Sequence, residues 1–308
     1  MKIQKKLLLA ASTLGLAFTA TVGSTYAWFA ANTNVTVTGM STKTQVSGNI
    51  LIAGTNSEAS YSTSLEQART ALIEPASTVD GVNFYYTVNA NGTGAAAGTG
   101  ASKYATYSEA TAQSNTYANK TAYDADFNTD YGVQTPAATA YGTAYAYIDY
   151  SFYLKATASE ANSKLSLTTC NFLYNETALS ATKAWRVAVF AVSTSANTEV
   201  TDVAAAVSGN RKTILAMNSA ANQESGKAVS STSATAAVTY GTAADIATGI
   251  AAGTTVYYKV VVRLWLEGED TTCTTDIFAA LTNAFSLSLT FSLGTSVTGV
   301  TEIGSVAA

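Results

Sequence analysis

Alternation of apolar and polar side chains with a period of two is the feature that most constrains how this chain can fold. Successive side chains of a β-strand point to opposite faces, so such alternation indicates strands with one buried face. The clearest case lies near the C-terminus, where apolar residues alternate with Ser and Thr: Phe285, Leu287, Leu289, Phe291 and Leu293. The pattern predicts a strand with one face in a core.

Several other segments show the same alternation. Residues 256–267 are apolar on one face and mixed on the other, which predicts a strand in the middle of a sheet. Further strands are predicted over residues 146–154, 185–191, 165–167, 50–53 and 84–88. One helix is expected early in the chain, because Ser64 and Gln67 form a capping box and Pro75 marks a stop.

Many strands, one short helix and no regular alternation of strands with helices define the expected fold class. The chain is predicted to be mainly β, an antiparallel two-sheet sandwich like a jelly roll. Residues 89–142 and 218–253 are rich in Ala, Gly, Ser, Thr and Asn and lack periodicity, so long low-complexity insertions are expected there. The domain is predicted to cover residues 39–308.

Tyrosine is concentrated in one part of the chain. Of the 18 tyrosines, 12 lie between Tyr85 and Tyr153. Tyrosine offers a large amphipathic contact area at a low entropic cost, so this region could form an adhesive surface. The equally weighted alternative is a lightly structured loop whose tyrosines pack locally.

The absence of histidine from all 308 residues excludes much chemistry. The chain alone cannot build a Ser-His-Asp or Cys-His catalytic system or a HExxH zinc site. With 16 Lys and Arg against 20 Asp and Glu, and no basic run after the first six residues, nucleic acid is not an expected partner. No spacing singles out a carboxylate pair or a Ser-Lys pair, so no enzymatic activity is expected.

The first 27 residues have the organisation of an export signal. Lys2, Lys5 and Lys6 precede a mainly apolar run over residues 7–22, and small residues surround a cleavage region that includes Thr25 and Ala27. A retained membrane anchor is the alternative, but a spanning helix needs about 20 apolar residues. The mature protein is therefore expected to be secreted, in the extracellular matrix or at the cell surface.

Cys170 and Cys273 are the only cysteines. Export would bring them to a compartment where disulfides persist, so an intramolecular disulfide between them is the first expectation. Two free thiols or an intermolecular bridge are the alternatives.

One acidic segment has oxygen-bearing side chains at alternate positions, as in the first half of a calcium loop: Asp124, Asp126, Asn128 and Asp130. The second half of that loop is missing, because Thr129 stands in place of the required Gly and Thr135 in place of the required Glu. An EF-hand is therefore not expected. The remaining alternatives are a weak calcium site or a solvated acidic turn, and no cofactor is expected.

Two segments resemble a known family. Residues 23–32, GSTYAWFAAN, resemble the export signals of the TasA/camelysin group, which a signal peptidase of the W type processes. Residues 262–273, VRLWLEGEDTTC, are similar to a C-terminal pattern of exported proteins with that signal type. The resemblance implies a jelly-roll subunit of biofilm-matrix filaments that binds copies of itself, the signal peptidase during export, and matrix polysaccharide or other matrix proteins. Camelysin-type relatives are described as proteases, which a chain without histidine does not favour.

The family resemblance implies that the N-terminal segment of one copy completes a sheet in the next. Residues 28–38 have the alternation that such strand addition requires. One face of this segment would carry Phe29, Ala31, Thr33, Val35 and Val37. The alternative, of equal weight, is that the segment is an ordinary first strand of its own domain. A third interpretation is a monomeric cell-surface adhesin or carbohydrate-binding module that uses the tyrosine-rich region.

Overall fold

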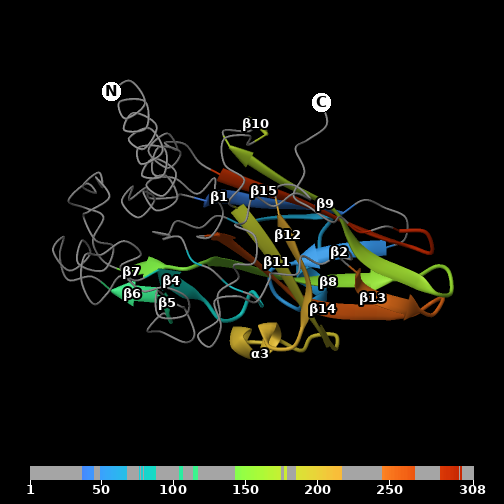
Figure 1. Ribbon diagram of the computed structural model, residues 1–308. Helices are drawn as coiled ribbons and strands as arrows, with labels where there is room; N and C mark the ends of the chain where they lie inside the picture. The colour runs from blue at the N-terminus through green and yellow to red at the C-terminus, as the bar shows by residue number, and fades with distance from the viewer. Residues whose placement is uncertain are drawn as a thin grey trace, which may run out of the picture.

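The computed structural model shows two β-sheets with a common core between them (Figure 1). The structure describes residues 37–44, 49–67, 76, 78, 80–87, 104–106, 114–116, 143–174, 177–178, 185–216, 245–267, 285–297 and 299. Within these residues the fold is mainly β, and all strand pairs except one are antiparallel. The predicted fold class is confirmed.

The first sheet has six strands in the order β10-β9-β15-β1-β3, with β13 also pairing with β9. Its strands are β1 (Val37–Thr44), β3 (Ser64–Gln67), β9 (Ser163–Tyr174), β10 (Thr177–Ala178), β13 (Asp245–Ile250) and β15 (Phe285–Gly294). β15 and β9 form its long antiparallel centre. β1 pairs with β15 in the one parallel arrangement.

The second sheet has five antiparallel strands in the order β12-β11-β14-β8-β2. Its strands are β2 (Asn49–Ala53), β8 (Ile148–Thr157), β11 (Trp185–Thr194), β12 (Arg211–Ala216) and β14 (Thr255–Leu266). β14 lies between β11 and β8, in the middle of the sheet, as predicted.

Short elements complete the described part of the chain. β4 (Tyr85–Thr87) pairs with β5 (Tyr104–Thr106), and β6 (Ser114–Thr116) pairs with β7 (Thr143–Tyr145). A 3-10 turn, η1, covers Glu58–Ser60. The α-helix α3 (Val203–Val207) begins after Asp202, whose carboxylate accepts a hydrogen bond from Ala205 N and so caps the helix.

The main core fills the space between the two sheets. The predicted apolar face of β15 is buried there, with Leu287, Leu289, Phe291 and Leu293 each at most 1% exposed. Phe291 meets Phe152 of β8 edge to face, with 5.8 Å between the ring centroids. This contact joins the two sheets through apolar side chains alone.

A second, smaller core covers the opposite face of the five-stranded sheet, which is called the outer face below. Phe84 packs edge to face on Trp265 with ring centroids 5.5 Å apart, and Val207 of α3 belongs to the same cluster. Figure 1 shows α3 on this side of the sheet. Both faces of β14 are therefore buried over most of its length, which explains why its second face carries Val261 and Trp265 besides its polar residues. Ala146, expected on the face of Ile148, lies instead in this second core.

The prediction of a helix that begins at Ser64 is wrong for residues 64–67. Ser64–Gln67 is the strand β3, which pairs with β1 from Met40 opposite Gln67 to Lys43 opposite Ser64. The capping pattern is a local signal, whereas the pairing with β1 supplies main-chain hydrogen bonds along the whole segment. The tertiary contact therefore overrides the local preference.

The second predicted insertion extends too far. Residues 245–250, within the expected insertion 218–253, form β13 and bury Ile246 and Ile250 in the main core. The expected insertion 89–142 contains β5 and β6. β13 was missed because its sequence, DIATGI, does not alternate. β5 and β6 were missed because each has only three residues within a stretch of small and polar residues.

Candidate functional site

The strand β1 is the first candidate site, because the sequence predicts an assembly role for the residues around it. It is an interior strand of the six-stranded sheet, between β15 and β3. Its parallel pairing with β15 runs from Val37 opposite Phe285 to Thr44 opposite Phe291, with an irregularity between Val37 and Met40. In Figure 1 the blue β1 lies beside the red β15. The first and the last described strands are thus neighbours.

The parallel geometry matters because a tight turn cannot connect parallel neighbours. No short connection therefore ties β1 to β15. Their pairing depends on main-chain hydrogen bonds, which any extended strand of similar length can form.

Only one of the five residues predicted for strand donation lies within the described residues. Val37 begins β1 and pairs with Phe285 of its own chain, so at this residue the segment acts as a first strand of its own sheet. The other four lie outside the described residues: Phe29, Ala31, Thr33 and Val35. For them strand donation stays a prediction.

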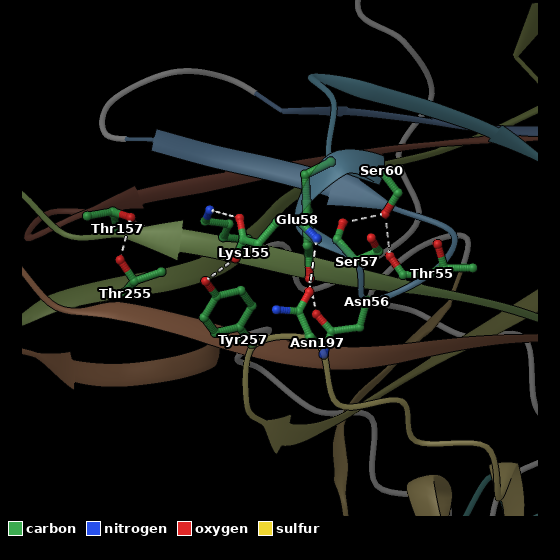
Figure 2. A network of polar contacts seen from close by, with 11 residues as sticks. Thr55, Asn56, Ser57, Glu58, Ser60, Lys155, Thr157, Asn197, Thr255 and Tyr257 are labelled. Atoms are coloured by element: carbon green, nitrogen blue, oxygen red, sulfur yellow. Dashed lines mark hydrogen bonds and ion pairs between the residues drawn. The ribbon is translucent and has the colours of Figure 1, made fainter.

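A polar cluster on the outer face of the five-stranded sheet is the second candidate site (Figure 2). Glu58 reaches from η1 to two strands, with its carboxylate oxygens 2.5 Å from Lys155 Nζ and 2.6 Å from the hydroxyl of Tyr257. The hydrogen bonds from Lys155 and then Tyr257 hold the pKa of Glu58 below its ordinary value. Because Glu58 is exposed and Lys155 and Tyr257 are partly exposed, the cluster positions the loop more than it stabilises the fold.

Asn56 connects this loop to the loop after β11. Its side-chain Nδ2 donates to the carbonyl oxygens of Ser195 and Thr198, each at 2.7 Å, and its backbone N–H donates to Glu199 Oε1 at 2.5 Å. Its Oδ1 accepts a hydrogen bond from the hydroxyl of Tyr61 at 2.7 Å. Asn56 is only 2% exposed, so its carboxamide is a fully hydrogen-bonded group shielded from water.

Lys259 and Tyr153 lie on the same face, near Glu199. Lys259 Nζ is 4.3 Å from the centroid of the Tyr153 ring, in a cation–π arrangement. The Tyr153 hydroxyl accepts a hydrogen bond from Val200 N at 2.8 Å. Burial, followed by the hydrogen bond with Glu199, raises the pKa of Tyr153 to about 12. Tyr153 is therefore a neutral phenol at physiological pH.

A third polar group, around Arg263, lies further along the outer face. Its guanidinium makes two hydrogen bonds of 2.8 Å to the carboxylate of Asp149 and one of 3.0 Å to the carbonyl oxygen of Gly81. The Tyr147 ring stacks on it, with its centroid 3.6 Å from Arg263 Cζ. Each of its three nitrogens donates a hydrogen bond to a group of the chain itself, so this arrangement is a structural clamp on the loop that contains Gly81.

The predicted disulfide is only half described. Cys170 of β9 is a free, buried thiol, and burial raises its pKa above the ordinary value. Cys273 lies outside the described residues, so the pairing stays a prediction.

The other predicted sites also lie outside the described residues. These are the calcium candidates Asp124, Asp126, Asn128 and Asp130 and the cleavage-region residues Thr25 and Ala27. Within the described ranges, no cluster of three or more acidic or cysteine residues could hold a metal ion. No helix in the same ranges is long and apolar enough to cross a membrane.

The tyrosine-rich region contributes to the core where its side chains are described. Tyr150 and Tyr153 are fully buried, and Tyr147 is 7% exposed. These three tyrosines pack inside the protein, which agrees with the alternative of local packing and not with an adhesive surface. The polar cluster around Asn56 was missed by sequence reasoning. Its one signal was a lysine, Lys259, in the otherwise apolar middle of a strand that the sequence predicted to be central.

Comparisons with protein-family models, with characterised proteins and with solved structures gave no match. The functional interpretation therefore rests on the sequence and on the geometry of β1 and the outer face.

Proposed function

We propose that this chain is a secreted structural subunit of extracellular filaments or of a biofilm matrix, and that copies assemble by N-terminal strand addition. The observation that carries the proposal is the position of β1, which lies between β15 and β3 and runs parallel to β15. The proposal assigns no catalytic activity and needs no cofactor. Its partners are copies of the chain, with matrix polysaccharide or other matrix proteins as further partners and signal peptidase acting during export.

Strand addition is supported by the kind of bonding that holds β1. β1 is held to β15 by main-chain hydrogen bonds. The affinity that these bonds give for an added strand does not depend on particular side chains. If β1, or the alternating residues before it, pairs in the sheet of the next copy, each copy both gives and receives a strand. A head-to-tail contact of this kind builds a filament when it does not close into a ring.

The first experiment compares two purified proteins by negative-stain electron microscopy. One begins at Trp28 and the other at Gly39, which removes the alternating segment but keeps most of β1. Filaments from the longer protein alone are expected, because only it contains the complete alternating segment 28–38. Equal circular dichroism spectra would show that the shorter protein is folded. If the longer protein stays monomeric at high concentration, the proposal is wrong.

A second experiment asks which sheet contains β1 in the filament. Ser41 and Ser288 are partners in the β1–β15 register. The variant Ser41→Cys/Ser288→Cys, in a Cys170→Ala/Cys273→Ser background, is oxidised after assembly. A ladder of disulfide-linked multimers would place β1 of one copy against β15 of the next. If only monomers with an internal disulfide form, β1 pairs with β15 of its own copy, and strand donation is restricted to the residues before Val37.

A further inference from the structure

Lys259 is a buried amine without an ionic partner. It is 7% exposed, and among the described contacts its Nζ has the Tyr153 ring at 4.3 Å but no salt bridge and no hydrogen bond. A buried ammonium group without such partners costs several kcal/mol. A chain that keeps a lysine here therefore either holds it as a neutral amine or uses it chemically.

The strand register places Lys259 in a row of residues across the sheet. Lys259 pairs with Val192 of β11 and with Tyr153 of β8, and Tyr153 pairs with Ala53 of β2. The chain leaves β2 after Ala53 and reaches Asn56 three residues later. The loop after β2 and the loop after β11 are joined by the hydrogen bonds of Asn56, so they meet above this row.

Tyr153 contacts both Lys259 and the loop after β11. Its ring contacts Lys259, and its hydroxyl binds the backbone of Val200 at 2.8 Å. The preceding residue, Glu199, accepts the hydrogen bond from Asn56 N at 2.5 Å. The charge of Glu199 also acts on Lys259. The amine and the carboxylate therefore both lie near the Tyr153 ring. The buried carboxamide belongs to Asn56, whose backbone N–H binds the same carboxylate.

Asn56 is held in a form suited to attack by an amine. Its carboxamide is fixed by three hydrogen bonds of 2.7 Å and is shielded from water. The Tyr61 hydroxyl donates to Oδ1, the atom on which negative charge develops when a nucleophile adds to Cγ. Exclusion of water disfavours the competing hydrolysis of the carboxamide.

We propose that Lys259 and Asn56 form an intramolecular amide bond, an isopeptide link between β14 and the loop after β2, with Glu199 carrying the proton. The neutral Nζ attacks Cγ of Asn56, and the Nζ–Cγ bond forms. Glu199 takes a proton from Nζ and delivers it to Nδ2. The Cγ–Nδ2 bond then breaks and ammonia leaves, so an amine and a primary amide become a secondary amide and ammonia. No oxidant, reductant or other reactant is required.

The electrostatics of the site favour the neutral nucleophile. Burial lowers the pKa of Lys259, and the nearby charge of Glu199 opposes this shift without reversing it. A lowered pKa increases the share of neutral amine at physiological pH. Formation of the amide also removes the buried charge. The link lies within one chain, so it does not depend on filament assembly.

The test is the intact mass of the mature protein, compared with the mass calculated from its sequenced N-terminus. A mass lower by one ammonia, about 17 Da, is expected, because amide formation expels that molecule. Tryptic peptides that contain Asn56 and Lys259 should then appear as one branched species. A mass equal to the calculated value would overturn the proposal. A loss of about 18 Da would also overturn it, because loss of water indicates a carboxylate such as Glu199 as the partner.

Three variants assign the roles. Lys259→Arg keeps the charge but cannot form the link, so the full calculated mass is expected. Glu199→Gln can still accept the hydrogen bond from Asn56 N but cannot carry a proton, so the unlinked mass should dominate. If Glu199→Gln links as completely as the wild type, the assigned role of Glu199 is wrong. Lys155→Arg changes a more exposed lysine on the same face and should keep the mass loss.

Discussion

At the scale of single residues, the outer face of the five-stranded sheet carries polar groups that an apolar pattern alone does not predict. Each nitrogen of the Arg263 guanidinium donates a hydrogen bond to Asp149 or Gly81, and the Tyr147 ring stacks on the group. Its side chain is 3% exposed, and that of Asp149 is 20% exposed. A buried ion pair of this kind matters most when one partner is lost, because the other is left without compensation.

Replacement of Arg263 should therefore destabilise the protein. Arg263→Met keeps much of the side-chain volume but leaves Asp149 and the Gly81 carbonyl unpaired. We expect the free energy of unfolding, measured with urea, to fall by about 3 kcal/mol. The matched control is Lys164→Met, which breaks the exposed contact of 3.7 Å with Asp245 and should cost less than about 1 kcal/mol. Equal effects of the two variants would contradict the assignment of Arg263 as a clamp.

At the scale of elements, the loop 80–84 is fixed by a local turn and by close packing on the sheet. The Asp80 carboxylate accepts hydrogen bonds from Val82 N at 2.7 Å and Asn83 N at 2.8 Å. Burial raises the pKa of Asp80, but the hydrogen bonds from Asn83 and Val82 outweigh it and hold the pKa below its ordinary value. Gly81 adopts a φ of 74°, a conformation that favours glycine.

Alanine substitutions at three glycines should separate the cost of backbone strain from the cost of crowding. In Gly81→Ala the new Cβ would lie 3.2 Å from Ala188 Cβ, so strain and crowding add, and a loss of about 2 kcal/mol is expected. Gly209→Ala has a φ of 71° but open space, so about 1 kcal/mol is expected. Gly54→Ala has neither and should change the free energy of unfolding by less than about 0.5 kcal/mol. A different order in chemical denaturation would refute this account.

At the scale of the whole molecule, the two sheets close over one core, and β9 contributes Cys170 to it. The thiol is 2% exposed, and its raised pKa keeps it protonated. A protonated, buried thiol is a poor nucleophile. Its reactivity therefore reports the opening of the core.

Labelling of Cys170 should follow global unfolding. In a Cys273→Ser variant, iodoacetamide at pH 8 is expected to leave the native protein unlabelled and to modify Cys170 at the rate of global unfolding. Mass spectrometry along a urea series, with circular dichroism as the second probe, checks this. Fast labelling in native buffer would mean that the strand around Cys170 opens without the rest of the core.

The sequence by itself determined the strands and the faces that they bury. Alternation of period two is a direct consequence of strand geometry, so β15, β14 and β11 could be predicted from residue order alone. It also indicated that β14 is central, because a strand that is covered on both sides has large apolar residues such as Val261 and Trp265 even on its mixed face.

The tertiary structure alone decided where each strand lies and which polar groups meet. Ser64 begins a strand rather than a helix because β1 supplies pairing that no local pattern records. The meeting of Asn56, Glu199 and Lys259 depends on two loops that are remote in the sequence and close over a third strand. Contacts between residues so far apart in the chain have no period in the sequence, so they become visible only once the sheets are formed.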